Sequence, residues 1–158
     1  MLSFIFPGQG SQRVGMGRAL VDVHPECRAT FEEADDVLGE SLSTLCFEGP
    51  EDRLTLTENA QPAILMVSVA TYRGLVARGL TPTSVAGHSL GEYSAHVAAG
   101  TMSFADALGI VRRRGQYMQE AVPVGEGAMA AILGLDADSV QRACDESSGG
   151  DVVGHQAE

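Results

Sequence analysis

The most informative segment of this chain is Ser84-Val85-Ala86-Gly87-His88-Ser89-Leu90-Gly91-Glu92. A short apolar run leads into a Gly-x-Ser-x-Gly motif, and a helix-forming segment follows the motif. This order is typical of a nucleophile elbow, which holds a serine hydroxyl at the end of a sheet strand. In that geometry the N–H of Leu90 and the N-terminus of the following helix point towards a developing oxyanion. The motif therefore predicts that Ser89 is a nucleophile that forms an acyl ester.

Ser89 has a second interpretation as a helix cap. The spacing of Ser89 and Glu92 is that of a capping box, and helix caps are far commoner than catalytic serines. The flanking Gly87 and Gly91 favour the elbow, because a sharp turn would bring Cβ atoms at these positions into contact with other groups. Both roles remain open from the motif alone, and one residue can fill both.

The composition limits the class of protein. The chain has 158 residues, of which 44% are hydrophobic, enough for about one domain with a packed core. The formal net charge of −11 argues against a nucleic-acid-binding surface. The three cysteines (Cys27, Cys46 and Cys144) form no metal-binding pattern, so we expect free thiols in a reducing compartment and no metal site. Since no apolar run reaches the length of a membrane span and the N-terminus does not resemble a signal peptide, we expect a cytoplasmic protein without membrane contact.

Strands and helices alternate along the chain. The pattern predicts strands at residues 2–6, as a buried strand, and 84–86, and helices over residues 16–23, 25–38, 41–47, 60–78, 90–99 and 104–121. Such alternation predicts an α/β fold with a parallel sheet. The helix over 60–78 is apolar on several sides, with Pro62 in its first turn, so we expect it to be largely buried.

The pattern of predicted elements changes after a linker at residues 123–127. A strand candidate at 128–133, a helix at 138–147, a turn at 148–150 and a further strand candidate from 151 to 153 follow it. We therefore expect residues 1–124 to belong to one unit and residues 125–158 to begin a second, smaller one.

Arg114 lies on the apolar face of the predicted helix over 104–121. At 100° per residue it falls within the buried arc, three residues after Val111 and four before Met118, whereas Arg112 and Arg113 point away from it. A buried guanidinium is costly unless an anion or several acceptors meet it. An internal salt bridge or a side chain that reaches the solvent would explain Arg114 as well as a grip on a substrate carboxylate does, and the residues alone leave these alternatives open.

Gly8-Gln9-Gly10-Ser11-Gln12 forms a glycine-rich loop after the first predicted strand. It lacks the Lys-Ser/Thr ending of a P-loop, so phosphate binding is disfavoured. Its position corresponds to that of the second oxyanion donor in hydrolase-like sheets. Taken alone, the loop is more simply explained as a tight turn.

Together these segments resemble the malonyl-CoA:acyl carrier protein transacylase family, the acyltransferases of fatty acid and polyketide synthesis. The resemblance runs from residue 2 to about 153 and rests on the following segments: Phe6-Pro7-Gly8-Gln9-Gly10-Ser11-Gln12, Glu48-Gly49-Pro50-Glu51-Asp52, Thr57-Glu58-Asn59-Ala60-Gln61-Pro62-Ala63, Gly87-His88-Ser89-Leu90-Gly91-Glu92-Tyr93, Arg114-Gly115 and Gly127-Ala128-Met129-Ala130-Ala131.

The resemblance implies a role for each of four residues. Ser89 is the acyl-accepting nucleophile, the backbone N–H groups of Gln9 and Leu90 form the oxyanion hole, and Arg114 pairs with the malonyl carboxylate. It implies coenzyme A thioester as a substrate rather than a tightly bound cofactor, and acyl carrier protein as the partner. The implied fold is an α/β-hydrolase-like parallel sheet over residues 1–124, here incomplete. The start of a ferredoxin-like small subdomain over 125–158 follows it.

The sequence departs from this family in one respect, the histidine base. The family places it well downstream of the small subdomain, and none of the four histidines (His24, His88, His96 and His155) corresponds to it. A serine without a base is a poor nucleophile at neutral pH. The chain therefore resembles the N-terminal portion of such an enzyme. Two other hypotheses remain open. The chain could be an inactive fragment that binds a partner or the complementing C-terminal half. A weaker alternative is a serine esterase that uses His155.

Overall fold

Two parallel strands end beside one another and place the two predicted site segments side by side. β1 (Ser3–Phe6) pairs with β2 (Ser84–Gly87) in a register that joins Ser3 to Ser84 and Phe6 to Gly87. Because parallel strands end at the same edge of a sheet, the loop after Phe6 meets the turn after Gly87. The parallel α/β arrangement predicted from the sequence is confirmed in this computed structural model, which describes residues 1–122, 125 and 132–147.

The chain divides into two compact units, Met1–Val124 and Gly125–Glu158. In the second unit the structure describes α8 (Ala137–Ser147), which confirms the helix predicted over 138–147 and buries none of its side chains. Residues 128–131 of one predicted strand, and the turn and strand predicted over 148–153, lie outside the described residues.

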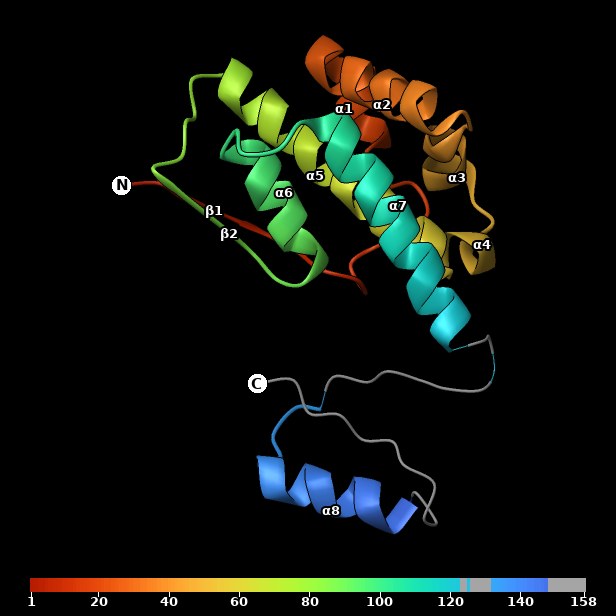
Figure 1. Cartoon of the computed structure of the whole chain (residues 1–158). Coiled ribbons are helices and arrows are strands. Elements are labelled where there is room, and N and C mark those ends of the chain that lie inside the picture. The colour runs from red at the N-terminus through yellow and green to blue at the C-terminus, as the bar shows by residue number, and fades with distance from the viewer. Residues whose placement is uncertain (123–124, 126–131, 148–158) are drawn as a thin grey trace. The chain divides into compact units, whose positions relative to one another are not determined.

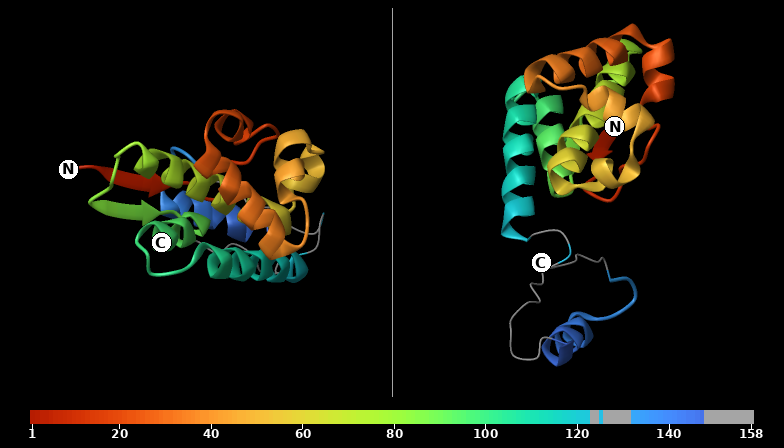
Figure 2. Two further views of the ribbon diagram at one scale, coloured as in Figure 1. Left: turned by 90° about the horizontal axis from the view of Figure 1, so that it is seen from above. Right: turned by 90° about the vertical axis from the view of Figure 1, so that its right-hand side faces the viewer.

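The long helix α5 (Thr57–Ala77) forms the centre of the first unit. It packs most extensively against α7 (Phe104–Ala121) and α2 (Pro25–Leu38), and also against α6 (Leu90–Ala98). The prediction that this helix is largely buried is confirmed. The helices of this unit lie on one side of the β1–β2 pair (Figure 1), and α7 runs alongside α6 (Figure 2). The large side chains that are almost completely buried in this core include Leu42, Leu54, Leu65, Met66, Leu90, Leu108, Val69 and Val111.

The start of α5 differs from the prediction. The helix begins at Thr57 rather than at residue 60, so Pro62 lies in its interior and not in its first turn. A proline has no N–H, so the carbonyl of Glu58, four residues earlier, loses its helical partner. Arg112 replaces that partner, because its Nη1 donates to the Glu58 carbonyl oxygen at 2.8 Å.

The orientation predicted for Arg112 is therefore wrong. Its side chain is only 14% exposed, pairs with the carboxylate of Glu40, and donates a second hydrogen bond to Oδ1 of Asn59 at 2.7 Å. Desolvation by burial lowers the pKa of this guanidinium. Helical periodicity indicated the solvent side, but the orphaned carbonyl on α5 draws Arg112 inwards. Arg113 is exposed, as predicted.

The shorter helices follow the predicted pattern with shifted ends. These are α1 (Arg18–Val23) and α3 (Leu42–Glu48), whereas the short helix α4 (Glu51–Thr55) was not predicted as a helix. α1 starts two residues later than predicted, because Gly17 has a φ of 82° and packs so closely on Phe31 that a Cβ would lie 2.4 Å from the ring. α7 begins as predicted, with the hydroxyl of Ser103 accepting from the N–H of Asp106 at 3.0 Å.

The first strand is not buried on both faces, which corrects the prediction. Phe6 is buried and Phe4 is partly buried, and both rings contact Tyr72 of α5 edge-on at centroid distances of 6.5 and 6.2 Å. Ile5 points the other way and is 79% exposed. Side chains alternate along a strand, and no described helix of the first unit covers the outer face of this sheet. An apolar run of five residues could not distinguish one covered face from two.

Candidate functional site

The turn between β2 and α6 has the backbone of a nucleophile elbow. Ser89 has φ 51° and ψ −108°, and it is the one non-glycine residue with a positive φ among the described residues. Left-handed backbone of this kind is strained for a residue with a Cβ, and such strain clusters at functional sites. Ser89 is exposed, and α6 begins at the next residue, Leu90. The N–H of Leu90 therefore has no acceptor within the helix.

The glycines around Ser89 are required by close backbone approaches. A Cβ on Gly87 would lie 2.0 Å from the carbonyl of Gly91, and a Cβ on Gly91 would lie 2.2 Å from the carbonyl oxygen of Phe6. The prediction that these glycines prevent clashes is confirmed. A Cβ on Gly8 would lie 2.8 Å from the carbonyl oxygen of His88. The loop that carries Gln9 thus packs directly against the turn that carries Ser89.

The hydroxyl of Ser89 does not cap α6, so the capping interpretation is wrong for its side chain. The positive φ turns Oγ away from the N–H groups of the first helical turn. Oγ instead accepts a hydrogen bond from Nη2 of Arg114 on α7 at 3.1 Å. The structure therefore brings together two of the residues predicted for the site, although they are separated by 25 positions.

Arg114 is partly buried and is held by neutral groups. Its Nη1 donates to Oε1 of Gln61 at 2.5 Å, and its guanidinium lies 5.9 Å from the centre of the Tyr93 ring. Among the described residues, no ion pair involves Arg114. Of the three explanations left open by the sequence, an internal salt bridge is therefore not observed. The positive charge faces the exposed serine, and no carboxylate of the described residues pairs with it.

Gln61 links Arg114 to the glycine loop. It is 1% exposed on α5, and its Nε2 lies 3.2 Å from Oε1 of Gln9 and 3.1 Å from the sulfur of Met118. The Nε2 of Gln9 in turn donates to Oγ1 of Thr57 at 3.1 Å. A hydrogen-bonded chain thus runs from the loop through Gln61 and Arg114 to Ser89.

Gln61 is not among the site residues predicted from the sequence. A usable signal was present, because an amide in the middle of an apolar, buried helix must find hydrogen-bond partners. Its partners come from segments about 50 positions away on either side, so no local pattern indicates which groups it meets.

No described histidine contacts the hydroxyl of Ser89. His88 is exposed next to it, His96 bonds to Thr101 at 2.8 Å, and His24 contacts Arg78. His155 lies outside the described residues. The described part of the chain therefore supplies the serine and the arginine but no hydrogen-bonded base.

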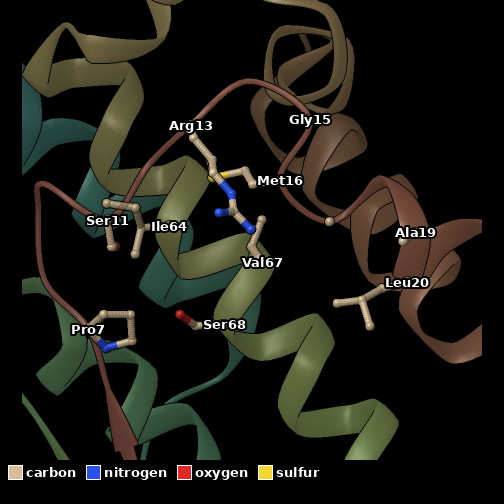
Figure 3. A pocket seen from close by; sticks show the side chains of 11 residues that line it. Pro7, Ser11, Arg13, Gly15, Met16, Ala19, Leu20, Ile64, Val67 and Ser68 are labelled. Atoms are coloured by element: carbon tan, nitrogen blue, oxygen red, sulfur yellow. The ribbon is translucent and has the colours of Figure 1, made fainter.

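A cavity of about 410 Å³ lies between the segment after β1 and α5 (Figure 3). Arg13, Met16, Val67 and Ser68 are among its lining residues. Ser89, Gln61 and Arg114 do not line it. The cavity is therefore separate from the hydrogen-bonded chain described above.

The described residues lack two further features, a membrane-spanning helix and a cluster of metal ligands. They include no helix long and apolar enough to cross a membrane. They also include no group of three or more His, Cys, Asp or Glu side chains placed to hold a metal ion. The cysteines Cys27 and Cys46 are buried, Cys144 is partly exposed, and all three are free thiols.

Comparison with known proteins identifies the family. The model of the acyl transferase domain matches residues 3–156. The malonyl CoA-acyl carrier protein transacylases of Bacillus subtilis (strain 168) and Escherichia coli (strain K12) are 54% and 51% identical over 145 and 152 residues. These alignments cover 92% and 96% of this chain but 46% and 49% of the relatives, so the chain spans about half the length of the curated relatives it matches.

Solved structures agree in sequence and in fold. The acyl-carrier-protein-S-malonyltransferase of Bartonella henselae is 52% identical with a TM-score of 0.84, covering 92% of this chain and 48% of that one. A malonyl-transacylase solved in complex with its type II PKS acyl-carrier protein is 49% identical with a TM-score of 0.87, covering 96% of this chain and 49% of that one. The chain belongs to the acyl transferase domain family, and it matches the N-terminal portion of malonyl CoA-acyl carrier protein transacylases.

Proposed function

We propose that this chain carries the acyl-accepting site of a malonyl-CoA:acyl carrier protein transacylase, which serves fatty acid or polyketide synthesis. Ser89 takes the malonyl group from coenzyme A and passes it to the phosphopantetheine thiol of acyl carrier protein. The observation that carries the proposal is the contact between Ser89 Oγ, at a strained strand-to-helix turn, and Arg114, a guanidinium with no carboxylate partner among the described residues. A serine beside an unpaired cation suits an acyl group that ends in a carboxylate.

In the first step, Oγ of Ser89 attacks the thioester carbonyl of malonyl-CoA. A C–O bond forms, the carbonyl oxygen becomes an oxyanion, and its collapse breaks the C–S bond and releases the coenzyme A thiol. The N–H groups of Leu90 and Gln9 hold the oxyanion in this proposal. The start of α6 at Leu90 and the close packing of Gly8 on His88 support the assignment.

Arg114 binds the free carboxylate of the malonyl group. A planar guanidinium matches a carboxylate with two parallel hydrogen bonds, and low exposure strengthens the attraction. In the absence of substrate, Nη2 of Arg114 rests on Ser89 Oγ. The same contact lowers the energy of a developing negative charge on the oxygen.

The proton of Ser89 requires a base that the described residues do not place in contact with it. We propose that the base comes from the portion of the protein that the relatives possess beyond the matched half. A histidine there takes the proton from Oγ during acylation and gives a proton to the leaving thiolate.

In the second step, the phosphopantetheine thiol attacks the ester carbonyl of malonyl-Ser89. The base takes the proton of the thiol, a C–S bond forms, the C–O bond breaks, and Oγ receives that proton from the base, which completes a ping-pong cycle. The solved malonyl-transacylase in complex with its acyl-carrier protein supports a carrier protein as the partner of this chain.

We also propose how the two units divide this fold. Residues 1–124 form part of a large α/β-hydrolase-like subdomain, and residues 125–158 begin a ferredoxin-like small subdomain. The parallel β1–β2 pair supports the first assignment. A structure of this chain with a complementing C-terminal half tests the second, because a ferredoxin-like unit requires an antiparallel sheet after residue 125.

A transfer assay tests the proposed function. The chain is incubated with malonyl-CoA and phosphopantetheinylated acyl carrier protein, alone and together with the C-terminal half of the Bacillus subtilis relative. We expect the carrier protein to gain the mass of one malonyl group in the mixture, and Ser89→Ala to abolish the gain. Ser84→Ala on β2 is the control and retains transfer. Absence of transfer under both conditions, or transfer that survives Ser89→Ala, contradicts the proposal.

A second candidate, an inactive chain that only binds a partner, has one observation in its favour. The outer face of the β1–β2 pair is uncovered among the described residues, with Ile5 79% exposed. The same mixture separates the candidates: a stable complex without malonyl transfer favours binding alone, whereas transfer that starts on mixing favours the enzyme.

A further inference from the structure

The buried amide of Gln61 lies directly behind the guanidinium of Arg114. An arginine has no hydrogen-bond acceptor, so the oxygen of the Gln61 amide must face it and the nitrogen must point the other way. The contacts agree: Oε1 accepts from Arg114, and Nε2 donates to Oε1 of Gln9 and approaches the sulfur of Met118. The network thus fixes which way the amide is turned.

The amide is placed where water cannot replace it. Gln61 is 1% exposed, whereas Ser89 at the other end of Arg114 is exposed. Nη1 of Arg114 is held by a buried acceptor, and Nη2 is directed at the open side of the site. Holding one arm of the guanidinium orients the other arm in advance, which reduces the entropy cost of binding a carboxylate.

The neutral charge of Gln61 is as important as its hydrogen bonds. Two arginines of α7 differ in what holds them. Arg112 pairs with the carboxylate of Glu40 and holds α5 through the Glu58 carbonyl, so its charge is balanced within the protein. Arg114 is held by an amide and a hydroxyl, neither of which carries a charge. A carboxylate in place of the amide would form an ion pair with Arg114 and compete with a substrate carboxylate.

We propose that Gln61 is a positioning residue that orients Arg114 and, because it is neutral, keeps the guanidinium charge available to a carboxylate on the acyl group. This inference rests on the proposed function for the identity of the acyl group. It predicts that the preference for a carboxylate-bearing acyl group depends on a side chain that touches neither the substrate nor Ser89.

Two substitutions separate orientation from charge. Gln61→Glu keeps the size and the acceptor but adds a negative charge, and Gln61→Met keeps the size but removes the acceptor. Gln116→Glu, on the exposed side of α7, is the control for the added charge. Circular dichroism and thermal unfolding verify that each variant is folded.

The first readout is acylation of Ser89 by malonyl-CoA against acetyl-CoA, in the mixture with the complementing half. We expect Gln61→Glu to slow malonyl transfer about 10-fold or more, equivalent to about 1.4 kcal/mol, and to change acetyl transfer much less. Gln61→Met should raise the KM for malonyl-CoA, and Gln116→Glu should leave both rates unchanged. Equal losses for the two acyl groups in Gln61→Glu would overturn the inference, because a purely structural role affects both.

The second readout does not depend on activity. In ¹⁵N-labelled protein, with Arg114→Lys to assign the signals, we expect separate Nη1 and Nη2 resonances for Arg114 from restricted rotation. The resonances should merge in Gln61→Met and remain separate in Gln116→Glu. If Ser89 is never acylated, the proposed function fails, and this readout still decides whether Gln61 orients Arg114. Unchanged Arg114 resonances in Gln61→Met would overturn the inference on their own.

Discussion

Arg114 on α7 donates a hydrogen bond from Nη2 to Oγ of Ser89 at 3.1 Å, and it does so without a carboxylate partner among the described residues. The contact joins the guanidinium of Arg114 on α7 to the exposed turn that precedes α6. Its geometry depends on α5, which supplies the buried acceptor for Nη1 through Gln61. The contact between Arg114 and Ser89 therefore depends on how α7 packs against α5.

Gly115 follows Arg114 at a point where the backbones of α7 and α5 approach closely. A Cβ there would lie 2.8 Å from both Cα of Glu58 and the carbonyl oxygen of Thr57, whereas a Cβ on Gly109 would meet nothing within 4 Å. We expect Gly115→Ala to destabilise the fold by about 1–3 kcal/mol through overpacking. Gly109→Ala in the same helix should stabilise it by about 1 kcal/mol through helix propensity. Urea unfolding measures both, and a stabilising Gly115→Ala would contradict the close crossing.

Arg112 and Arg113 are adjacent but differ in burial. Arg112→Met removes the donor for the Glu58 carbonyl and leaves Oδ1 of Asn59 without its donor, so we expect a loss of about 2 kcal/mol in the free energy of unfolding. Arg113→Met changes an exposed side chain, and we expect a change within about 0.5 kcal/mol. Similar effects of the two substitutions would show that Arg112 does not hold α5 at Pro62.

The three thiols should react at very different rates. Burial raises the pKa of Cys46 to about 12 and also raises the pKa of Cys27, so both remain protonated at pH 8. The thiolate fraction of Cys46 at that pH is about one in ten thousand. We expect iodoacetamide to label Cys144 alone in the native chain and all three cysteines in urea, as measured by peptide mass spectrometry. Rapid native labelling of Cys27 or Cys46 would contradict the described core.

Arg114 should decide between acyl groups rather than act on all of them. We expect Arg114→Ala to lower the rate of malonyl transfer by about 100-fold or more. The rate of acetyl transfer should fall less, because the acetyl group has no carboxylate. Arg114→Lys keeps the charge but not the two-armed geometry, so it should restore malonyl transfer only in part. Rates for the two thioesters in the complemented transfer assay measure the ratio. A loss of the same size for malonyl and acetyl would rule out a carboxylate clamp.

Local signals in the sequence predicted the parts of the fold that depend on local chemistry. Ser103 capped its helix as expected, and the run before Gly87 formed a strand that enters a sharp turn. The glycine spacing around Ser89 was informative because a tight turn has few solutions for the residues on either side. The placement of Arg114 followed from helical periodicity, since its helix is regular over 18 residues.

The features that the sequence did not predict depend on contacts between distant segments. Arg112 turns inwards because Pro62, 50 positions earlier, leaves a carbonyl without a donor, and periodicity within one helix cannot contain that fact. The partners of Gln61 come from the loop after β1 and from α7, so its role became visible only in three dimensions. The exposed face of β1 depends on which elements cover the sheet, and the strand's own residues do not determine this.

The position of the acyl group shows whether malonyl transfer passes through Ser89. The chain, complemented by the C-terminal half of the Bacillus subtilis relative, is incubated with malonyl-CoA without carrier protein, quenched in acid and digested for peptide mass spectrometry. We expect one malonyl group, attached as an ester to Ser89. The ester should be lost from Ser89 when the carrier thiol is added before quenching. A malonyl group on another residue, or an unmodified Ser89 in a complex that nevertheless transfers malonyl to the carrier, would contradict transfer through Ser89.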